Sequence, residues 1–161
     1  SDEPIDVREL IERSIQAFGG HTYVANIVVD ATSTARLKGN RAEIETVIVN
    51  LLSNALRYTP ADGQITIGWR SGEDGADLVV ADTGEGIDPE HIPRLTERFF
   101  RIDKGRSRED GGVGLGLAIV KHVLARHEAE LFVTSAPGVG SEFRCHFPVE
   151  RLSVPDPTQL S

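Results

Sequence analysis

The sequence predicts a domain of the α/β class, because segments with the spacing of helices alternate with segments that have the spacing of strands. The clearest helix covers residues 41–58, where apolar residues recur every three or four positions along one face. The clearest strand covers residues 64–70, where apolar and polar residues alternate. A turn at 59–63, which contains proline, aspartate and glycine, separates the two elements.

Weaker patterns extend this prediction along the rest of the chain. Residues 6–18 have apolar positions at helical spacing, with Asp6 as a candidate N-cap and a glycine pair after the last turn. A further helix is expected to follow the glycine-rich segment 112–116 and to end near residue 127. Shorter segments with strand character cover residues 27–29, 35–38, 77–82, 131–135 and 141–149.

The composition excludes several classes of protein. The 161 residues carry 17 Lys and Arg against 25 Asp and Glu, and the resulting net charge of −8 is unsuited to general binding of nucleic acid. Hydrophobic residues make up 39%, which suffices for one domain with its own core. The single cysteine, Cys145, excludes an intrachain disulfide. It shares a strand face with Phe143 and Phe147, so we expect it in the core.

Targeting and hydrolytic motifs are missing from the sequence. No run of about 18 apolar residues is present, and the acidic start Ser-Asp-Glu-Pro is not typical of a signal peptide. None of the five histidines has the HExxH spacing of a zinc site, and no serine lies in a GxSxG turn. We therefore expect a cytoplasmic domain over residues 1–150 and a frayed tail at 151–161.

The helix predicted at 41–58 carries the first candidate site. Glu43, Asn50, Asn54 and Arg57 lie in a narrow stripe beside its apolar face. An amide oxygen, together with phosphate and water, suits Mg²⁺. The alternative interpretation is an ordinary solvated helix face, although two asparagines in the middle of a helix are poor helix formers.

Two segments that contain glycine supply further candidates. Asp82-Thr-Gly-Glu-Gly-Ile at 82–87 follows an apolar strand, where a carboxylate could accept from the amine of adenine; the alternative is an ordinary turn. The segment 111–117 has glycines at the start of a predicted helix, where exposed N–H groups favour phosphate; the alternative is a hinge or a packing device. The Walker and Rossmann spacings both fail here.

These pieces occur in an order that resembles the ATP-binding catalytic domain of sensor histidine kinases, over roughly residues 4–150. The resemblance rests on the N box, the first glycine box, the F box, the second glycine box and a closing Gly-Ser element, which correspond to residues 50–60, 82–87, 97–103, 112–120 and 140–143. Residues 91–104 and 116–122 are similar to the phosphate-regulon sensors within this family.

The resemblance implies a fold and a set of ligands. The fold is a two-layer α/β sandwich of the Bergerat (GHKL) type, with helices on one face of a mixed sheet. The ligands are ATP and Mg²⁺, held between the helices and a lid at residues 103–111. Phe99 and Phe100 would anchor this lid.

Residue roles follow from the same resemblance. Asn54 would hold Mg²⁺ with the support of Asn50, and Arg57 and Arg101 would meet phosphates, so Asn54 and the two arginines are the candidate catalytic residues. Asp82 would accept from the adenine amine, helped through water by Ser141. The remaining implied ATP contacts are at Tyr58, Gly84, Gly86, Ile87, Lys104, Gly112, Val113, Gly114, Leu115, Gly116 and Leu117.

The implied activity is autophosphorylation in two-component signalling. The chain would supply the γ-phosphoryl of ATP to a histidine on an upstream dimerisation domain, and a response regulator would receive it. His127-Glu128 only superficially resembles the phosphoacceptor motif. The implied full-length protein is a homodimer anchored in the bacterial inner membrane, whereas this chain alone would be monomeric. The alternative is a clamp or sensor module of the same superfamily that binds nucleotide without transferring phosphate.

Overall fold

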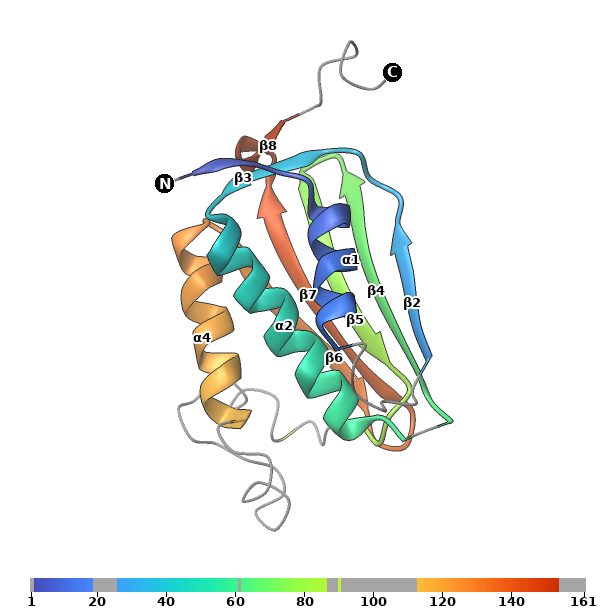
Figure 1. The fold of residues 1–161 in the computed structure, drawn as a ribbon. Helices are drawn as coiled ribbons and strands as arrows, with labels where there is room; N and C mark the ends of the chain where they lie inside the picture. The colour runs from blue at the N-terminus through green and yellow to red at the C-terminus, as the bar shows by residue number, and fades with distance from the viewer. Residues whose placement is uncertain (1, 19–25, 61, 87–89, 91–112, 154–161) are drawn as a thin grey trace.

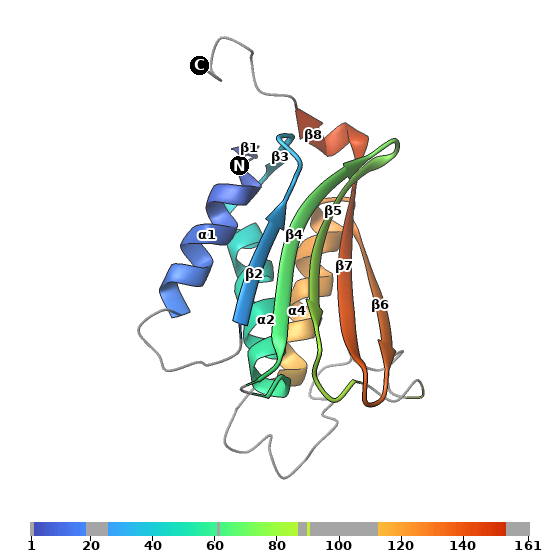
Figure 2. The same cartoon turned by 90° about the vertical axis from the view of Figure 1, so that its right-hand side faces the viewer.

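The computed structural model describes residues 2–18, 26–60, 62–86, 90 and 113–153. These residues form two layers, with three helices against one face of a five-stranded sheet (Figure 1). Figure 2 shows the same layers from the side, with α1, α2 and α4 on one side of the sheet. The α/β class and the two-layer sandwich expected from the sequence are therefore confirmed.

The elements follow one another in an order that mixes strands and helices. They are β1 (Glu3–Ile5), α1 (Val7–Phe18), β2 (Asn26–Ala31), β3 (Arg36–Gly39), α2 (Arg41–Tyr58), β4 (Gln64–Gly72), β5 (Gly75–Asp82), α4 (Val113–Arg126), β6 (Glu130–Ala136), β7 (Gly140–Pro148), the 3₁₀ turn η2 (Val149–Arg151) and β8 (Leu152–Ser153).

The main sheet has the strand order β2-β4-β5-β7-β6. β2 runs parallel to β4, and every other neighbouring pair is antiparallel, so the sheet is mixed. A second, smaller sheet has the order β1-β3-β8 and joins the two ends of the described chain. The register of the main sheet brings Asp82 of β5 opposite Ser141 of β7, and Ser141 opposite Ser135 of β6.

The core lies between the sheet and the helices. The alternation predicted for β4 is confirmed, because Ile65, Ile67 and Trp69 are all buried. The ring of Trp69 meets that of Phe147 edge to face, with 5.9 Å between centroids. Cys145 is fully buried beside them, and this burial raises the pKa of its thiol to about 12. Its expected place in the core is confirmed.

Two predicted boundaries differ from the structure. The last helix was expected to follow the glycine-rich segment, but α4 begins at Val113 and therefore contains Gly114 and Gly116. Glycines can lie inside the first turn of a helix and still leave its first N–H groups exposed. Their spacing in the sequence therefore did not show whether they precede α4 or belong to it. At the other end, the fold continues to Ser153 rather than ending at residue 150, because β8 pairs with β3.

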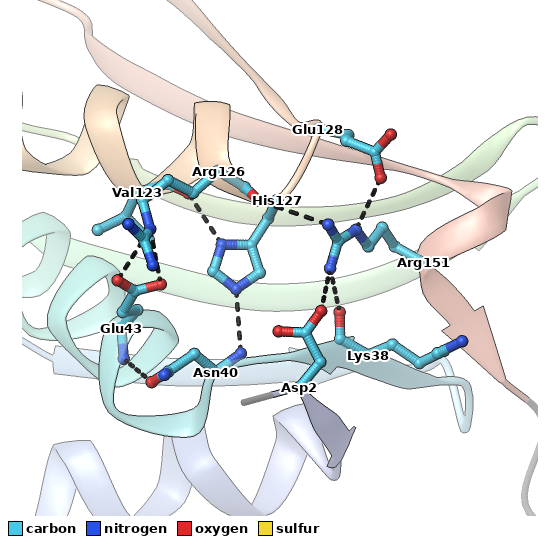
Figure 3. A network of polar contacts seen from close by, with 9 residues as sticks. All are labelled: Asp2, Lys38, Asn40, Glu43, Val123, Arg126, His127, Glu128 and Arg151. Carbon is cyan, nitrogen blue, oxygen red and sulfur yellow. Dashed lines mark hydrogen bonds and ion pairs between the residues drawn. The ribbon is translucent and has the colours of Figure 1, made fainter.

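A polar network fastens the helices at the end of the molecule where the chain begins (Figure 3). His127 is 2% exposed. Its Nδ1 lies 2.8 Å from the carbonyl oxygen of Val123, and its Nε2 accepts from the backbone N–H of Asn40 at 3.1 Å. Because a carbonyl only accepts and an amide N–H only donates, the neutral tautomer with hydrogen on Nδ1 satisfies both contacts. His127 thus joins the end of α4 to the start of α2.

Ion pairs around His127 extend this network to the N-terminal segment (Figure 3). Arg126 of α4 reaches Glu43 of α2 at 3.1 Å. Arg151 of η2 donates to Glu128 at 2.9 Å and to Asp2 at 2.8 Å. The Arg151 side chain also bonds two backbone carbonyls, those of Lys38 and Arg126. The C-terminal end of α4 is therefore held from several sides.

Candidate nucleotide-binding site

The candidate residues that the structure describes lie at the opposite end of the molecule. The C-terminal end of α2, the N-terminal end of α4, the end of β5 and the turn between β6 and β7 all lie there (Figure 1). The structure therefore brings together the described residues of the N box, of the two glycine boxes and of the closing Gly-Ser element.

Asn50 and Gly116 approach each other where α2 packs against α4. The Asn50 Nδ2 donates to the carbonyl oxygen of Thr46 at 2.8 Å, which leaves the amide oxygen facing α4. A Cβ atom at Gly116 would lie only 2.7 Å from that oxygen. Gly116 is helical, so its small size serves close packing rather than a left-handed turn. Asn54 is half-buried one turn further along α2.

The N-terminus of α4 suits an anion. Its first turn, Val-Gly-Leu-Gly, contains no acidic residue, and the first N–H groups of any helix lack partners inside the helix. The positive end of the helix dipole adds to this preference. Arg57, in the last turn of α2, is the cationic residue that the N box contributes at this end of the molecule. Leu117 is 5% exposed and packs in the core, so its side chain holds the first turns of α4 against the core.

Asp82 places a carboxylate at the end of β5. One oxygen accepts from the Gly84 N–H at 2.8 Å, and the backbone of Ser141 also hydrogen-bonds the carboxylate. Burial raises the pKa of Asp82 above its ordinary value, and these two backbone bonds only partly oppose that effect. Such a side chain is well suited to accept a hydrogen bond from a planar donor that enters the site.

The first glycine box is held by the β6–β7 turn and by α2. A Cβ atom at Gly84 would collide with the carbonyl oxygen of Tyr58, and one at Gly86 would collide with that of Ala136. Gly86 also has a φ of +76°, a region that side chains disfavour. The Gly138 N–H donates to the carbonyl oxygen of Glu85 at 2.7 Å. Glycine is thus required for contact at 84 and for both contact and conformation at 86.

A row of polar side chains crosses the three strands β5, β7 and β6 next to the first glycine box. Asp82, Ser141 and Ser135 face one another in register on β5, β7 and β6. Ser141, at 9% exposed, was predicted from the closing Gly-Ser element, whereas Ser135 was not. The signal that could have revealed Ser135 is its place in β6: it continues the inward series of Leu131 and Val133 but is polar.

A cleft of about 350 Å³ opens at Gly84, the residue whose N–H bonds Asp82, and none of the three side chains of the row lines it. Three of its lining residues, Arg57, Tyr58 and Gly84, belong to the predicted site. The others come from the turn after α2, from the first glycine box and from the β6–β7 turn, and they are Thr59, Pro60, Thr83, Glu85 and Gly138. The hydroxyl oxygen of Thr59 is buried there without a hydrogen-bond partner among the described residues.

Several predicted residues lie outside this description. Ile87, Arg101, Lys104 and Gly112 fall in segments that the structure does not describe, as do the expected F box and lid. Val113, Gly114 and Leu115 are placed only as part of α4. Their assigned contacts with ATP stay predictions.

His127 cannot serve as a phosphoacceptor in this fold, because it is buried and both of its ring nitrogens are engaged. Among the described residues, no three His, Cys, Asp or Glu side chains are grouped to hold a metal ion. In the same part of the chain, no helix is both long and apolar enough to cross a membrane.

The fold and this arrangement of boxes define the class of protein. Residues 39–151 match the family described as "Histidine kinase-, DNA gyrase B-, and HSP90-like ATPase", and the chain belongs to that family.

Within the family, the chain is similar to sensor kinases. It is 55% identical over 121 residues to the phosphate regulon sensor protein PhoR of Pseudomonas aeruginosa, which covers 75% of this chain and 27% of the relative. It is 42% identical over 146 residues to the sensor-like histidine kinase SenX3 of Mycobacterium tuberculosis, which covers 89% of this chain and 36% of the relative.

A solved structure supports the same placement. The mycobacterial sensor histidine kinase MprB matches with a TM-score of 0.80 at 29% identity, over 92% of this chain and 97% of that one. The curated relatives named above are longer proteins, of which this chain spans 27% and 36%.

Proposed function

We propose that this chain is the ATP-binding catalytic domain of a sensor histidine kinase. It binds ATP with Mg²⁺ and supplies the γ-phosphoryl group to a histidine on a dimerisation domain that precedes it. A response regulator then receives the phosphoryl group, in a pathway of the phosphate-regulon type. The proposal places the domain in the bacterial cytoplasm, as part of a homodimer anchored in the inner membrane.

One observation carries the proposal: the half-buried carboxylate of Asp82 and the N-terminus of α4 lie at the same end of the sandwich. A purine needs an acceptor for its amine, and a triphosphate needs N–H donors and positive potential. The similarity to PhoR and SenX3 supports the sensor-kinase and phosphate-regulon parts.

The residues perform this task by positioning and by charge neutralisation. Asp82 accepts from the base, and Tyr58 borders the cleft beside it. The N–H groups at the N-terminus of α4 and the guanidinium of Arg57 compensate the phosphate charge. Asn50 sets the distance between the two helices through Gly116. We assign no general base.

The oxygen ligands that the described residues offer suit Mg²⁺ only if phosphates and water supply the rest of its coordination. Mg²⁺ prefers six oxygen ligands and retains water, and it is commonly held by one or two protein groups plus substrate phosphates. Asn54 offers an amide oxygen at the correct end of α2, and no acidic metal cluster is present among the described residues. Mg²⁺ would neutralise phosphate charge during transfer.

The alternative function is a nucleotide-binding module that does not transfer phosphate. The family includes DNA gyrase B- and HSP90-like ATPases, so the fold alone does not separate the two functions. The similarity to sensor kinases over 75% to 89% of the chain favours the kinase.

The test joins this domain to the dimerisation domain of the full-length protein and supplies γ-labelled ATP with Mg²⁺. We expect a phosphorylated product that is labile in acid and stable in base, as phosphohistidine is. Asn54→Ala should abolish the label, and Thr134→Ala, an exposed change on β6, should retain it. Tight ATP binding without any label would establish the non-transferring module instead.

A further inference from the structure

One hydroxyl in the floor of the site lies outside every sequence box. Ser135 stands on β6, opposite Ser141 of β7, which stands opposite Asp82 of β5. The three side chains therefore form one polar row on the helix-facing side of the sheet. The adjacent row on the same strands is apolar and consists of Val133, Phe143 and Val80. Asp82 and Ser135 are half-buried and Ser141 is 9% exposed, and polar groups covered to this extent are normally hydrogen-bonded.

Two hydrogen bonds of the Ser135 hydroxyl have defined directions. Its Oγ lies 2.9 Å from the carbonyl oxygen of Gly140, and a carbonyl only accepts, so the Ser135 hydrogen points there. Its Oγ also lies 2.9 Å from the Oγ of Ser141. Because Ser135 has a single hydroxyl hydrogen, Ser141 is the donor in this second bond. The Ser141 oxygen then has only lone pairs left for any other partner.

We propose that Ser135 is a positioning residue that fixes the Ser141 hydroxyl as a hydrogen-bond acceptor toward the ligand. The inference rests on the proposed function and deepens it. With Ser141 held in this way, the floor presents acceptors from two neighbouring strands, the Ser141 oxygen and the Asp82 carboxylate. Such a floor favours a base edge that carries N–H donors, whether directly or through a water. A 6-aminopurine has N–H donors at position 6, whereas a 6-oxopurine has an acceptor oxygen there and keeps a donor only at N1.

Removal of Ser135 would change the behaviour of Ser141. The Ser141 hydroxyl hydrogen would lose the Ser135 Oγ as its acceptor. It could then turn toward the neighbouring Asp82 carboxylate or toward the ligand. Either turn replaces an acceptor with a donor, or occupies the carboxylate that the base needs. A purely structural role for Ser135, through its bond to Gly140, would instead weaken the β6–β7 turn without altering the choice of base.

The experiment measures dissociation constants for ADP and IDP with Mg²⁺ by calorimetry. The variants are Ser135→Ala, Ser135→Thr, Ser141→Ala and the Ser135→Ala/Ser141→Ala double variant. Thr134→Ala is the matched control, because it removes a hydroxyl from the next residue of β6, which is exposed. Melting temperatures of all variants are recorded in parallel.

We expect Ser135→Ala to weaken ADP about three- to tenfold, the range of one neutral hydrogen bond, and to reduce the preference for ADP over IDP. Ser135→Thr and Thr134→Ala should keep that preference. The double variant should lose no more than Ser141→Ala alone, since Ser135 acts through Ser141.

Two results would overturn the inference while the proposed function stands. One is an unchanged ratio of ADP to IDP affinity in Ser135→Ala. The other is an additive loss in the double variant, which would assign Ser135 to support of the turn. If the wild-type chain binds neither nucleotide at millimolar concentration, the proposed function itself fails, and the inference fails with it.

Discussion

Asp82 illustrates at the scale of one residue how a ligand site is kept at the expense of the fold. Its pKa is raised because burial disfavours the ionised form, and the described contacts that oppose this are backbone N–H groups rather than a cation. A folded state that raises the pKa of an acid binds more protons than the unfolded state between the two pKa values. Stability therefore falls as pH rises through that window.

We predict that Asp82→Asn raises the melting temperature at neutral pH and weakens adenine nucleotides. The amide keeps an oxygen for Gly84 but turns an NH₂ toward the donor edge of the base, and opposed donors cost about 1–3 kcal/mol. The gain in melting temperature over wild type should be small near pH 3.8, the ordinary pKa of the group, and larger above it. Thermal scans from pH 4 to pH 7 and calorimetry with ADP check both halves. A variant that binds ADP as tightly as wild type would refute the adenine role.

Cys145 gives a second prediction at this scale. Its pKa of about 12 leaves almost no thiolate at neutral pH, and its side chain is fully buried. The folded chain should not react with a thiol reagent at pH 8 over hours, whereas the chain unfolded in guanidinium should react with one equivalent. Rapid modification of the native chain would show that β7 opens far more readily than a core strand should.

At the scale of the elements, α4 links the two ends of the molecule. It begins beside Asn50 at the candidate site and ends at His127 in the polar network. The two ends depend on different physical effects. The first needs the close approach of two helices, and the second needs satisfied polar groups.

We predict that Gly116→Ala weakens ATP more than it weakens adenosine. The new methyl group would lie 2.7 Å from the Asn50 oxygen, so either this amide or the start of α4 must move. The free energy of unfolding should change by no more than about 1 kcal/mol, because alanine favours a helix over glycine by about that amount. Ile119→Ala, a change at a partly exposed position of α4, is the control. A large fall in melting temperature with an unaltered ratio of affinities would make Gly116 a packing device only.

The opposite end of α4 should behave in the reverse manner. His127→Phe keeps a ring of similar size but leaves the Asn40 N–H and the Val123 carbonyl without their present partner. Each such buried group costs about 1–3 kcal/mol, so the free energy of unfolding should fall by at least 1 kcal/mol. Denaturant titration measures this fall. The affinity for ADP should stay at the wild-type value, and a tenfold loss of affinity would contradict the separation of the two ends.

At the scale of the whole molecule, local patterns predicted what local physics determines. The buried face of β4 followed from the alternation that ends at Trp69, and the long helix α2 followed from its apolar spacing. The stripe of Asn50, Asn54 and Arg57 was visible for the same reason. What the sequence could not show depends on pairing between distant segments.

Two short strands and one serine illustrate that limit. β1 has three residues, one of them Pro4, and β8 has two, so neither has a measurable period; each exists through its pairing with β3. Ser135 belongs to the site only because the register of β6 and β7 places it beside Ser141. Segments such as 91–112 lie outside the described residues, so the roles assigned there to Arg101 and Lys104 stay predictions.

The most direct test of the central claim is to map nucleotide binding on the chain by amide NMR during titration with Mg²⁺ and ATP or ADP. We expect binding in the micromolar to millimolar range, about 4–8 kcal/mol. The largest shifts should occur at Gly84, Gly116 and Ser141, at the end formed by α2, α4 and β5. The amide signals of Asn40 and His127 at the other end should not shift. Absence of shifts at millimolar nucleotide, or shifts centred on Asn40 and His127, would contradict the account.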